Sequence, residues 1–194
     1  MKNSNSNISF LLSLALLFSS PSLLAKSQKK NSLLDSAVRR VESALVSPPQ
    51  DQEVCFSPDE MCDVKIIKFI QSAQKSIDVA IYDINIDQLV HELLIASKRI
   101  PVRIIVDRRQ AKGDHSLVPT LIKGGAQLRF GKQRGIMHNK FIIVDNKMIE
   151  TGSFNFTNHA SLANNENQIY LSNPNIVEKF KKRFEQLWAK ASLP

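Results

Sequence analysis

The sequence predicts an α/β protein with a mixed β-sheet sandwiched between helices. Three observations support this fold class: segments with the 3.6-residue spacing of helices alternate with β-rich segments, the apolar run at 102–106 is typical of a buried strand, and 140–151 has the pattern of a hairpin. Strands separated by helices can pair in parallel, whereas a hairpin adds antiparallel strands. The sheet is therefore expected to be mixed.

The elements follow one another in a regular order along residues 53–194, which are expected to form one folded domain. Gly124 and Gly125 provide a C-cap signal for the helix before them, and Asp145 and Asn146 separate the two strands of the hairpin. In chain order, the periodicities predict strand 54–56, helix 62–75, strand 76–82, helix 86–98, strand 102–106, helix 116–123, strand 127–130, strands 140–144 and 147–151, strand 167–171 and helix 175–190.

The residues before this domain form two segments. The first 25 have the pattern of a secretory signal peptide, because their apolar stretch is shorter than the roughly 20 residues of a spanning helix and Ala25 precedes a basic stretch. The alternative is an uncleaved N-terminal anchor. Residues 26–52 are a lead-in, in which apolar spacing predicts an amphipathic helix over 32–46. The chain is therefore expected to be exported, to the periplasm or out of the cell.

The composition is that of a globular protein with excess positive charge. The 194 residues include 26 Lys and Arg against 18 Asp and Glu, a formal net charge of +8. With 43% hydrophobic and 23% charged residues, the chain is not wholly disordered. The charge favours an anionic partner such as nucleic acid or an anionic lipid surface, and it does not choose between the two.

Cys55 and Cys62 are candidates for a disulfide. They are the two cysteines of the chain, which excludes a multi-disulfide scaffold and a zinc site made of cysteines alone. In an oxidising compartment they could close a small loop, but the sequence does not show whether their Cα atoms are close enough. Zinc is disfavoured because no paired CxxC or nearby histidine completes the usual ligand set.

Residues able to carry chemistry gather between 135 and 168. If the chain is extended from His138 onward, His138 and Lys140 point to one face. The other face carries Met137, Phe141 and Ile143. Phosphodiester cleavage needs such a pair, a nitrogen nucleophile or base and a fixed cation for the non-bridging oxygens. Ser153 and Asn155 could add neutral donors to the same oxygens, and Glu166 could accept a hydrogen bond from the second ring nitrogen of the histidine.

Two motifs in this region carry a family resemblance: His138-x-Lys140-x4-Asp145 and Gly152-Ser153-x-Asn155. Together they resemble the HKD motif of the phospholipase D superfamily. The likeness covers residues 54–190, and the segments 76–83, 102–107 and 150–157 resemble the small bacterial endonucleases of that superfamily. The resemblance implies a phospholipase D-like α/β/α catalytic domain and a homodimer with a shared active site.

The resemblance also implies a reaction that uses two histidines and needs no metal ion or cofactor. One histidine attacks phosphorus to form a phosphohistidine, and the other protonates the leaving oxygen. The chain has one His-x-Lys, at His138, because His91, His115 and His159 lack the lysine. One chain would thus supply half a site and a two-fold partner the rest. The expected supporting roles are charge stabilisation by Lys140, Ser153 and Asn155, and orientation of the histidine by Glu166. Asp145 is expected to be structural and to support either the strand turn or the positions of the lysine and histidine.

Cationic residues just before the motif are expected to bind a phosphate backbone, and their alternative interpretation is an ordinary solvated surface. They are Arg103, Arg108, Arg109, Lys112, Lys123, Arg129, Lys132 and Arg134. The single motif, the small size and the likeness to the small endonucleases favour a nuclease acting on DNA or RNA, and the sequence has no recognisable recognition helix or finger, so non-specific cleavage is expected. Two alternatives remain. One is a phospholipase D that hydrolyses phosphatidyl headgroups and could dock through residues 32–46, although an ordinary packing or linker helix is the favoured interpretation of that segment. The other is an inactive nucleic-acid-binding protein.

Overall fold

In the computed structural model, residues 34–131 and 135–194 are described, and the chain divides into two units, Met1–Leu45 and Val46–Pro194. In the first unit, residues 34–45 form a helix, inside the range that the sequence predicts. The predicted signal peptide lies outside the described residues. Among the helices that the structure describes, none is long and apolar enough to cross a membrane.

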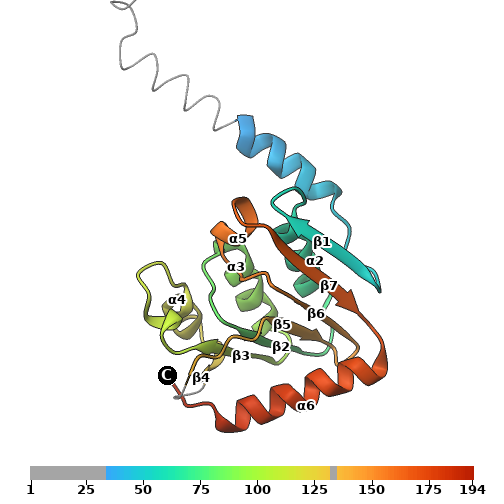
Figure 1. The fold of residues 1–194 in the computed structure, drawn as a ribbon. Coiled ribbons are helices and arrows are strands. Elements are labelled where there is room, and N and C mark those ends of the chain that lie inside the picture. The colour runs from blue at the N-terminus through green and yellow to red at the C-terminus, as the bar shows by residue number, and fades with distance from the viewer. Residues whose placement is uncertain (1–33, 132–134) are drawn as a thin grey trace, which may run out of the picture. The chain divides into compact units, whose positions relative to one another are not determined.

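The second unit is built on a seven-stranded mixed sheet, which confirms the predicted fold class (Figure 1). The strand order is β1-β7-β6-β5-β2-β3-β4, in which β2, β3 and β4 run parallel and the other pairs are antiparallel. Each predicted strand is present, with ends that differ by a residue at most. The strands are β1 (Glu53–Ser57), β2 (Ile77–Ile81), β3 (Val102–Asp107), β4 (Gln127–Gly131), β5 (Phe141–Val144), β6 (Met148–Gly152) and β7 (Glu166–Leu171).

Helices cover both faces of this sheet (Figure 1). Helices α2 (Cys62–Ser72), α3 (Asp87–Ser97) and α4 (Val118–Lys123) pack on one face, and α6 (Pro174–Lys190) packs on the other. The sequence analysis missed the short α5 (Asn158–Leu162) and the 3-10 turn η1 (Gln110–Lys112). Elements of about one turn show too little periodicity to be detected.

The alternation of side chains along the strands separates two hydrophobic cores. On β5, Ile142 and Val144 face the core under α2 and α3, whereas Phe141 and Ile143 face the core under α6. Met137, just before the strand, also lies in the core under α6. This is the division of faces that the sequence predicts around His138 and Lys140.

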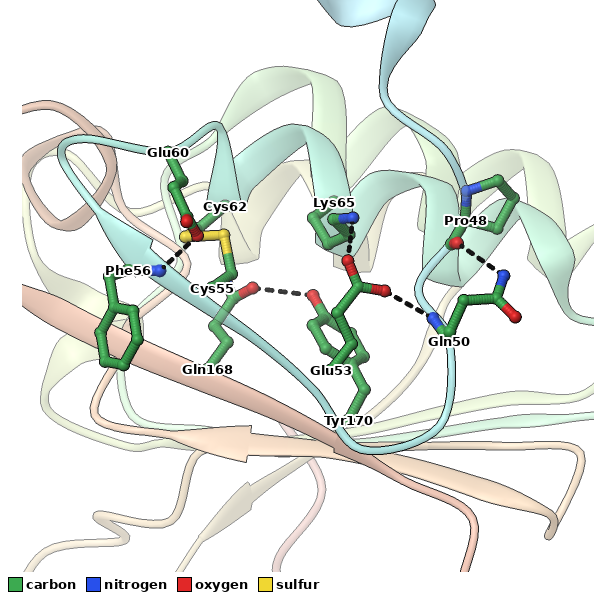
Figure 2. A network of polar contacts seen from close by, with 10 residues as sticks. All are labelled: Pro48, Gln50, Glu53, Cys55, Phe56, Glu60, Cys62, Lys65, Gln168 and Tyr170. Atoms are coloured by element: carbon green, nitrogen blue, oxygen red, sulfur yellow. Dashed lines mark hydrogen bonds and ion pairs between the residues drawn. A yellow bond between two sulfur atoms is a disulfide. The ribbon is translucent and has the colours of Figure 1, made fainter.

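A disulfide joins the edge strand β1 to the first residue of α2 (Figure 2). The Cα atoms of Cys55 and Cys62 are 5.7 Å apart and their sulfurs are bonded, so neither sulfur remains as a thiolate ligand for zinc. On the same strand, the Glu53 carboxylate accepts a hydrogen bond from the Lys65 ammonium of α2. Strand β1 is therefore held to α2 at two points, one covalent and one ionic.

Part of the predicted lead-in belongs to the folded unit. The backbone N–H of Gln52 donates to the carbonyl of Tyr170 at 2.9 Å, and that of Ser172 donates to the Asp51 carboxylate at 2.6 Å. These bonds extend the pairing of β1 and β7 beyond Glu53. The lead-in therefore ends before residue 51, because residues 51 and 52 are already fixed on the sheet.

One acidic side chain is buried in the core under α2. Glu150 of β6 is 0% exposed, and neither of its carboxylate oxygens has a hydrogen-bond partner among the described residues. Its cross-strand neighbour Tyr170 donates its hydroxyl to Gln168 at 2.7 Å (Figure 2). Burial raises the pKa of Glu150 well above its usual range, because the buried environment favours the neutral form of the carboxyl group.

Candidate active site

His138 and Lys140 lie at the edge of the sheet where β5 begins. Phe141, the first residue of β5, pairs with Ala80 near the end of β2 and with Thr151 near the end of β6. The predicted strand started at residue 140, whereas His138 lies in the irregular segment that leads into β5. The ends of β2, β3 and β6 and the beginnings of β5 and β7 thus meet at one edge, where α/β proteins commonly bind ligands.

The side chains of His138 and Lys140 contact each other directly. The Lys140 Nζ is 3.3 Å from the Nε2 of His138, and it donates a hydrogen bond to the His138 carbonyl at 3.2 Å. The imidazole is exposed, whereas Lys140 is 8% exposed. Burial lowers the pKa of the Lys140 ammonium, and the nearby Glu166 carboxylate partly opposes that shift. A cation is therefore held beside a reactive imidazole nitrogen.

Ser153 and Glu166 form a second pair at the same edge of the sheet. The Ser153 hydroxyl donates to one Glu166 oxygen at 2.5 Å, and the Asn164 amide donates to the other at 2.9 Å. Among the described residues of one protomer, no hydrogen bond joins Glu166 to His138, and the predicted bond stays a prediction. The register of β6 and β7 brings Glu166 to Ser153 instead, and Ser153 also accepts the backbone N–H of Asn167 at 3.1 Å.

Gly152 allows this close approach of β6 and β7. A Cβ atom at this position would lie 2.0 Å from the carbonyl oxygen of Asn167. That distance is too short for any residue with a side chain, so only glycine fits here. The backbone N–H of Ser153 donates to that same oxygen at 3.1 Å. The glycine of the motif therefore has a steric role, which places the Ser153 hydroxyl beside the Glu166 carboxylate.

Asn155 is half-buried in the segment that follows Ser153. The backbone N–H of Phe156 donates to the Asp83 carbonyl at 3.1 Å, which fixes this segment beside the residues after β2. The side-chain Oδ1 of Asn155 is buried and has no hydrogen-bond partner among the described residues. Buried amide groups are nearly always hydrogen-bonded, so this one is a good candidate to bind a substrate or a second chain.

Asp145 lies at the opposite end of β5 from His138 and does not share its site. Its carboxylate accepts backbone N–H groups from Gln74 at 3.0 Å, Lys75 at 2.6 Å and Ser76 at 3.0 Å. Asp145 has a φ of 56° in the turn between β5 and β6. These bonds agree with the expected structural role of Asp145 at the strand turn, and they hold its carboxylate at the end of β5 away from His138.

Arg103 is not free to bind a substrate, contrary to the sequence prediction. Its guanidinium donates two hydrogen bonds to Asp78, at 2.7 and 2.8 Å, and another to Glu185 of α6 at 2.7 Å. It also lies over the rings of Phe184 and Trp188. The hydrogen bonds to Asp78 raise the pKa of Arg103, so it is a permanent cation that links the sheet to α6.

The other predicted cations have different environments. Arg108 donates to the Ser192 hydroxyl and lies over the Phe130 ring, so it too is held by the fold. Arg109 is exposed just beyond the end of β3 and remains available to an anionic ligand. Lys132 and Arg134 lie outside the described residues.

Three residues without a predicted role are linked to the histidine by direct or indirect contacts. The Tyr82 ring packs edge-on against the His138 imidazole, with 4.6 Å between the ring centroids. Gln110 donates to the Tyr82 hydroxyl at 2.7 Å, and the Asp107 carboxylate accepts the backbone N–H of Met137 at 2.9 Å. Tyr82 and Asp107 are polar residues at the ends of two strands that the sequence predicts. Because the ends of parallel strands meet at one edge of a sheet, this position could have indicated both residues.

Comparison with protein families gives one match to most of the folded unit. The family described as cardiolipin synthase, PLD-like domain, matches residues 66–188. The mitochondrial cardiolipin hydrolase of Chlamydomonas reinhardtii is 34% identical over 125 residues, which are 64% of this chain and 56% of that protein. A phospholipase D of Rickettsia conorii is 35% identical over 128 residues, 65% of this chain and 64% of that protein. The chain thus spans less than two thirds of the length of these curated relatives.

Solved structures share the fold. Nuc from Salmonella typhimurium, a phospholipase D family member, is 34% identical with a TM-score of 0.67, and the match covers 72% of this chain and 94% of that one. NucT from Helicobacter pylori has the same TM-score at 23% identity and covers 73% of this chain and 98% of that one, a likeness of fold alone.

Proposed function

The chain belongs to the phospholipase D superfamily, and we propose that it is a metal-independent phosphodiesterase that acts as a non-specific endonuclease on DNA or RNA. The observation that carries this proposal is the contact between the Lys140 ammonium and the Nε2 of His138 at 3.3 Å. An imidazole and an ammonium lie side by side at the edge of the sheet, and we propose that they act as nucleophile and cation. A phosphodiester offers an electrophilic phosphorus to the first and anionic oxygens to the second.

The first step is attack by the Nε2 of His138 on phosphorus. A nitrogen–phosphorus bond forms, one phosphorus–oxygen ester bond breaks, and the leaving oxygen takes a proton from a second imidazole. In the second step that imidazole takes a proton from water, the water oxygen attacks phosphorus, and the bond to His138 breaks. The products are an alcohol and a phosphomonoester, and both imidazoles return to their initial protonation states.

Lys140 has a role at the start of this sequence. Its ammonium lies beside the Nε2 lone pair that must attack. A phosphate oxygen is an anionic acceptor and forms the stronger, charge-assisted hydrogen bond. Substrate binding would therefore draw the ammonium onto the phosphate and free Nε2 for attack. We propose that the half-buried amide of Asn155 donates to another non-bridging oxygen, and that Ser153 does so once its hydroxyl proton moves from the Glu166 carboxylate to the phosphate.

The second imidazole is proposed to come from a second copy of the chain. One chain holds a single His-x-Lys, and the described contacts of His138 include no other histidine. A two-fold homodimer would bring the partner's copy of the same half-site to the substrate. The two identical imidazoles would then titrate as a coupled pair, one neutral and one protonated.

A nucleic acid is the preferred substrate because of charge and family likeness. The net charge is +8, and Arg109 and Lys112 are exposed beyond β3. The motif segments resemble those of small bacterial endonucleases. A phospholipase D activity is the second candidate, because relatives carry that name and Ile136, two residues before His138, is 47% exposed and could contact a lipid. An inactive nucleic-acid-binding protein is disfavoured by the intact site.

A single substrate panel tests the proposal. Plasmid DNA, single-stranded RNA and phosphatidylcholine vesicles are incubated with the protein in EDTA, with His138→Asn as the control. We expect cleavage of nucleic acid by the wild type alone, weakening steeply as salt is raised because phosphate contacts release counterions. Headgroup release without nucleic-acid cleavage would assign the phospholipase activity instead, and loss of all activity in EDTA would refute the metal-independent mechanism.

We also propose that the protein is exported to the periplasm or secreted. The Cys55–Cys62 disulfide supports this proposal, because disulfides persist in oxidising compartments. The mass of the mature protein recovered outside the cytoplasm tests it. Cleavage after Ala25 is the expected result, and a full-length protein confined to the cytoplasm would contradict the proposal.

A further inference from the structure

We infer that Tyr82 is a positioning residue whose ring holds the His138 imidazole and the Lys140 ammonium in their mutual arrangement. The inference rests on the proposed function, since it assigns Tyr82 to the same reaction. Tyr82 directly follows β2, and it is half-buried beside the start of β5. It touches the two reacting side chains and is not expected to touch the scissile phosphate itself.

One aromatic ring contacts both members of the reactive pair. The Tyr82 and His138 rings have centroids 4.6 Å apart and planes at 70°, an edge-to-face arrangement that aromatic pairs favour. The Lys140 Nζ lies 5.4 Å from the centroid of the same ring, within the range of a cation–π contact. The ring therefore restrains the imidazole and the ammonium together, which contacts to either one alone would not do.

The imidazole needs this restraint because its other contacts are few. In the described part of the chain, the one polar partner of the His138 ring is Lys140. Glu166, the carboxylate expected to orient the ring, is held by Ser153 and Asn164. An exposed histidine without an orienting carboxylate can rotate about its side-chain bonds, and packing against Tyr82 limits that rotation.

The Tyr82 ring is itself fixed relative to the backbone that carries His138. Gln110 donates to the Tyr82 hydroxyl at 2.7 Å, and its own backbone N–H donates to the Asp107 Oδ1 at 3.2 Å. The Oδ2 of Asp107 accepts the backbone N–H of Met137, the residue before His138, at 2.9 Å. Asp107 is 2% exposed, so these bonds are shielded from water. A closed circuit of contacts thus joins the ring to the imidazole that it packs against.

The comparison of Tyr82→Leu with Tyr82→Phe tests the inference. Tyr82→Leu removes the ring, and we expect kcat to fall by about 10- to 100-fold with little change in KM, because small misplacements of reacting groups have effects of that size. Tyr82→Phe keeps the ring and loses the bond to Gln110, and we expect it to keep kcat within about threefold. Gln110→Ala frees the hydroxyl without touching the ring and should match Tyr82→Phe. If Tyr82→Leu does not fold, Gln110→Ala still tests the inference, because a loss of kcat of about 10-fold or more with the ring in place would overturn it.

A second readout needs neither substrate nor activity. The ring protons of His138 lie beside an aromatic ring, so their NMR resonances should carry a ring-current shift in the wild type and in Tyr82→Phe, and lose it in Tyr82→Leu. Unchanged resonances in Tyr82→Leu would overturn the inference, as would an unchanged kcat or an equal loss of kcat in Tyr82→Phe. If the wild type cleaves no phosphodiester while the shift disappears in Tyr82→Leu, the proposed function fails and the contact stands.

Discussion

The two ends of β5 carry the three residues that name the motif, and they differ in almost every physical respect. At one end, the exposed His138 imidazole has a single polar side-chain partner, Lys140. At the other end, the Asp145 carboxylate accepts backbone N–H groups from three consecutive residues, 74–76. Five residues of extended chain separate Lys140 from Asp145 by about 16 Å. A spacing motif therefore marks one strand and its two ends rather than one site.

Reactive and structural residues differ in how many of their possible hydrogen bonds are formed within the protein. A reactive group needs unsatisfied bonding capacity, which His138 and the buried Oδ1 of Asn155 retain. A structural group fills its capacity within the protein, as Asp145 does.

Removing the reactive end should abolish activity and leave the fold intact. We expect His138→Asn to lower kcat by at least about three orders of magnitude, because it removes the nucleophile, with an unchanged melting temperature. The matched control is Asp145→Asn, which changes the other end of the strand and should keep kcat within about threefold. The comparison is wrong if the two variants lose similar activity.

Removing the Asp145 carboxylate should lower the stability of the fold and leave the activity largely intact. Asp145→Ala loses a carboxylate bonded to three backbone N–H groups and puts alanine at a φ of 56°, so we expect a loss of about 2–3 kcal/mol in the free energy of unfolding. Asp145→Asn tolerates the same backbone conformation and should lose less. Urea unfolding with a parallel activity assay measures both quantities, and an inactive but fully stable Asp145→Ala protein would contradict the division.

The acid stability of the protein should follow the same residue. Partial burial acts to raise the pKa of Asp145, but the N–H groups of Lys75, Ser76 and Gln74 lower it below its usual range. The unfolded chain has an aspartate pKa of about 3.9, and the folded protein has a lower one. The ionised carboxylate therefore stabilises the fold above that pKa of the unfolded chain, and this stabilisation is lost as pH falls through the pKa of the folded protein. Asp145→Asn should therefore unfold with a shallower pH dependence than the wild type between about pH 5 and 2.

At the reactive end, burial of Lys140 should appear in the alkaline limb of the pH–activity profile. Its pKa is lowered by burial, so the cation that binds phosphate should be lost below the ordinary lysine value of about 10.4. Lys140→Arg keeps a cation at all accessible pH values and should lack this limb, at a reduced kcat. A wild-type profile that stays flat beyond pH 10.4 would contradict the assignment.

Glu150 sharpens the comparison because it is a carboxyl group with neither reactive nor structural partners. Burial raises the pKa of Glu150 in the folded protein. The contribution of Glu150 to the free energy of unfolding is therefore largest at acid pH, and it falls as pH rises above the pKa that the carboxyl group has in the unfolded chain. Glu150→Gln cannot ionise and should raise the melting temperature by a few degrees at pH 8, with little change at pH 5. A larger gain at pH 5 than at pH 8 would show that the carboxyl group is not neutral in the fold.

The sequence predicts the strands well because their signals are local. The apolar run of β3 and the turn residues between β5 and β6 need no knowledge of the rest of the chain. The partners of Arg103 and Glu166 are different, because they depend on which strands become neighbours. Arg103 is bound by Asp78 through the parallel register of β2 and β3, and Glu166 meets Ser153 through the register of β6 and β7. Such pairings arise only when the sheet assembles.

The most direct test of the central claim is the activity of a mixed dimer. Wild-type and His138→Asn chains with different affinity tags are co-expressed, and the dimer that carries both tags is purified. If two chains share one site, this dimer lacks one of the two histidines and should be as inactive as the His138→Asn homodimer. A mixed dimer with about half of the wild-type activity would show that each chain has an independent site, and it would contradict the account.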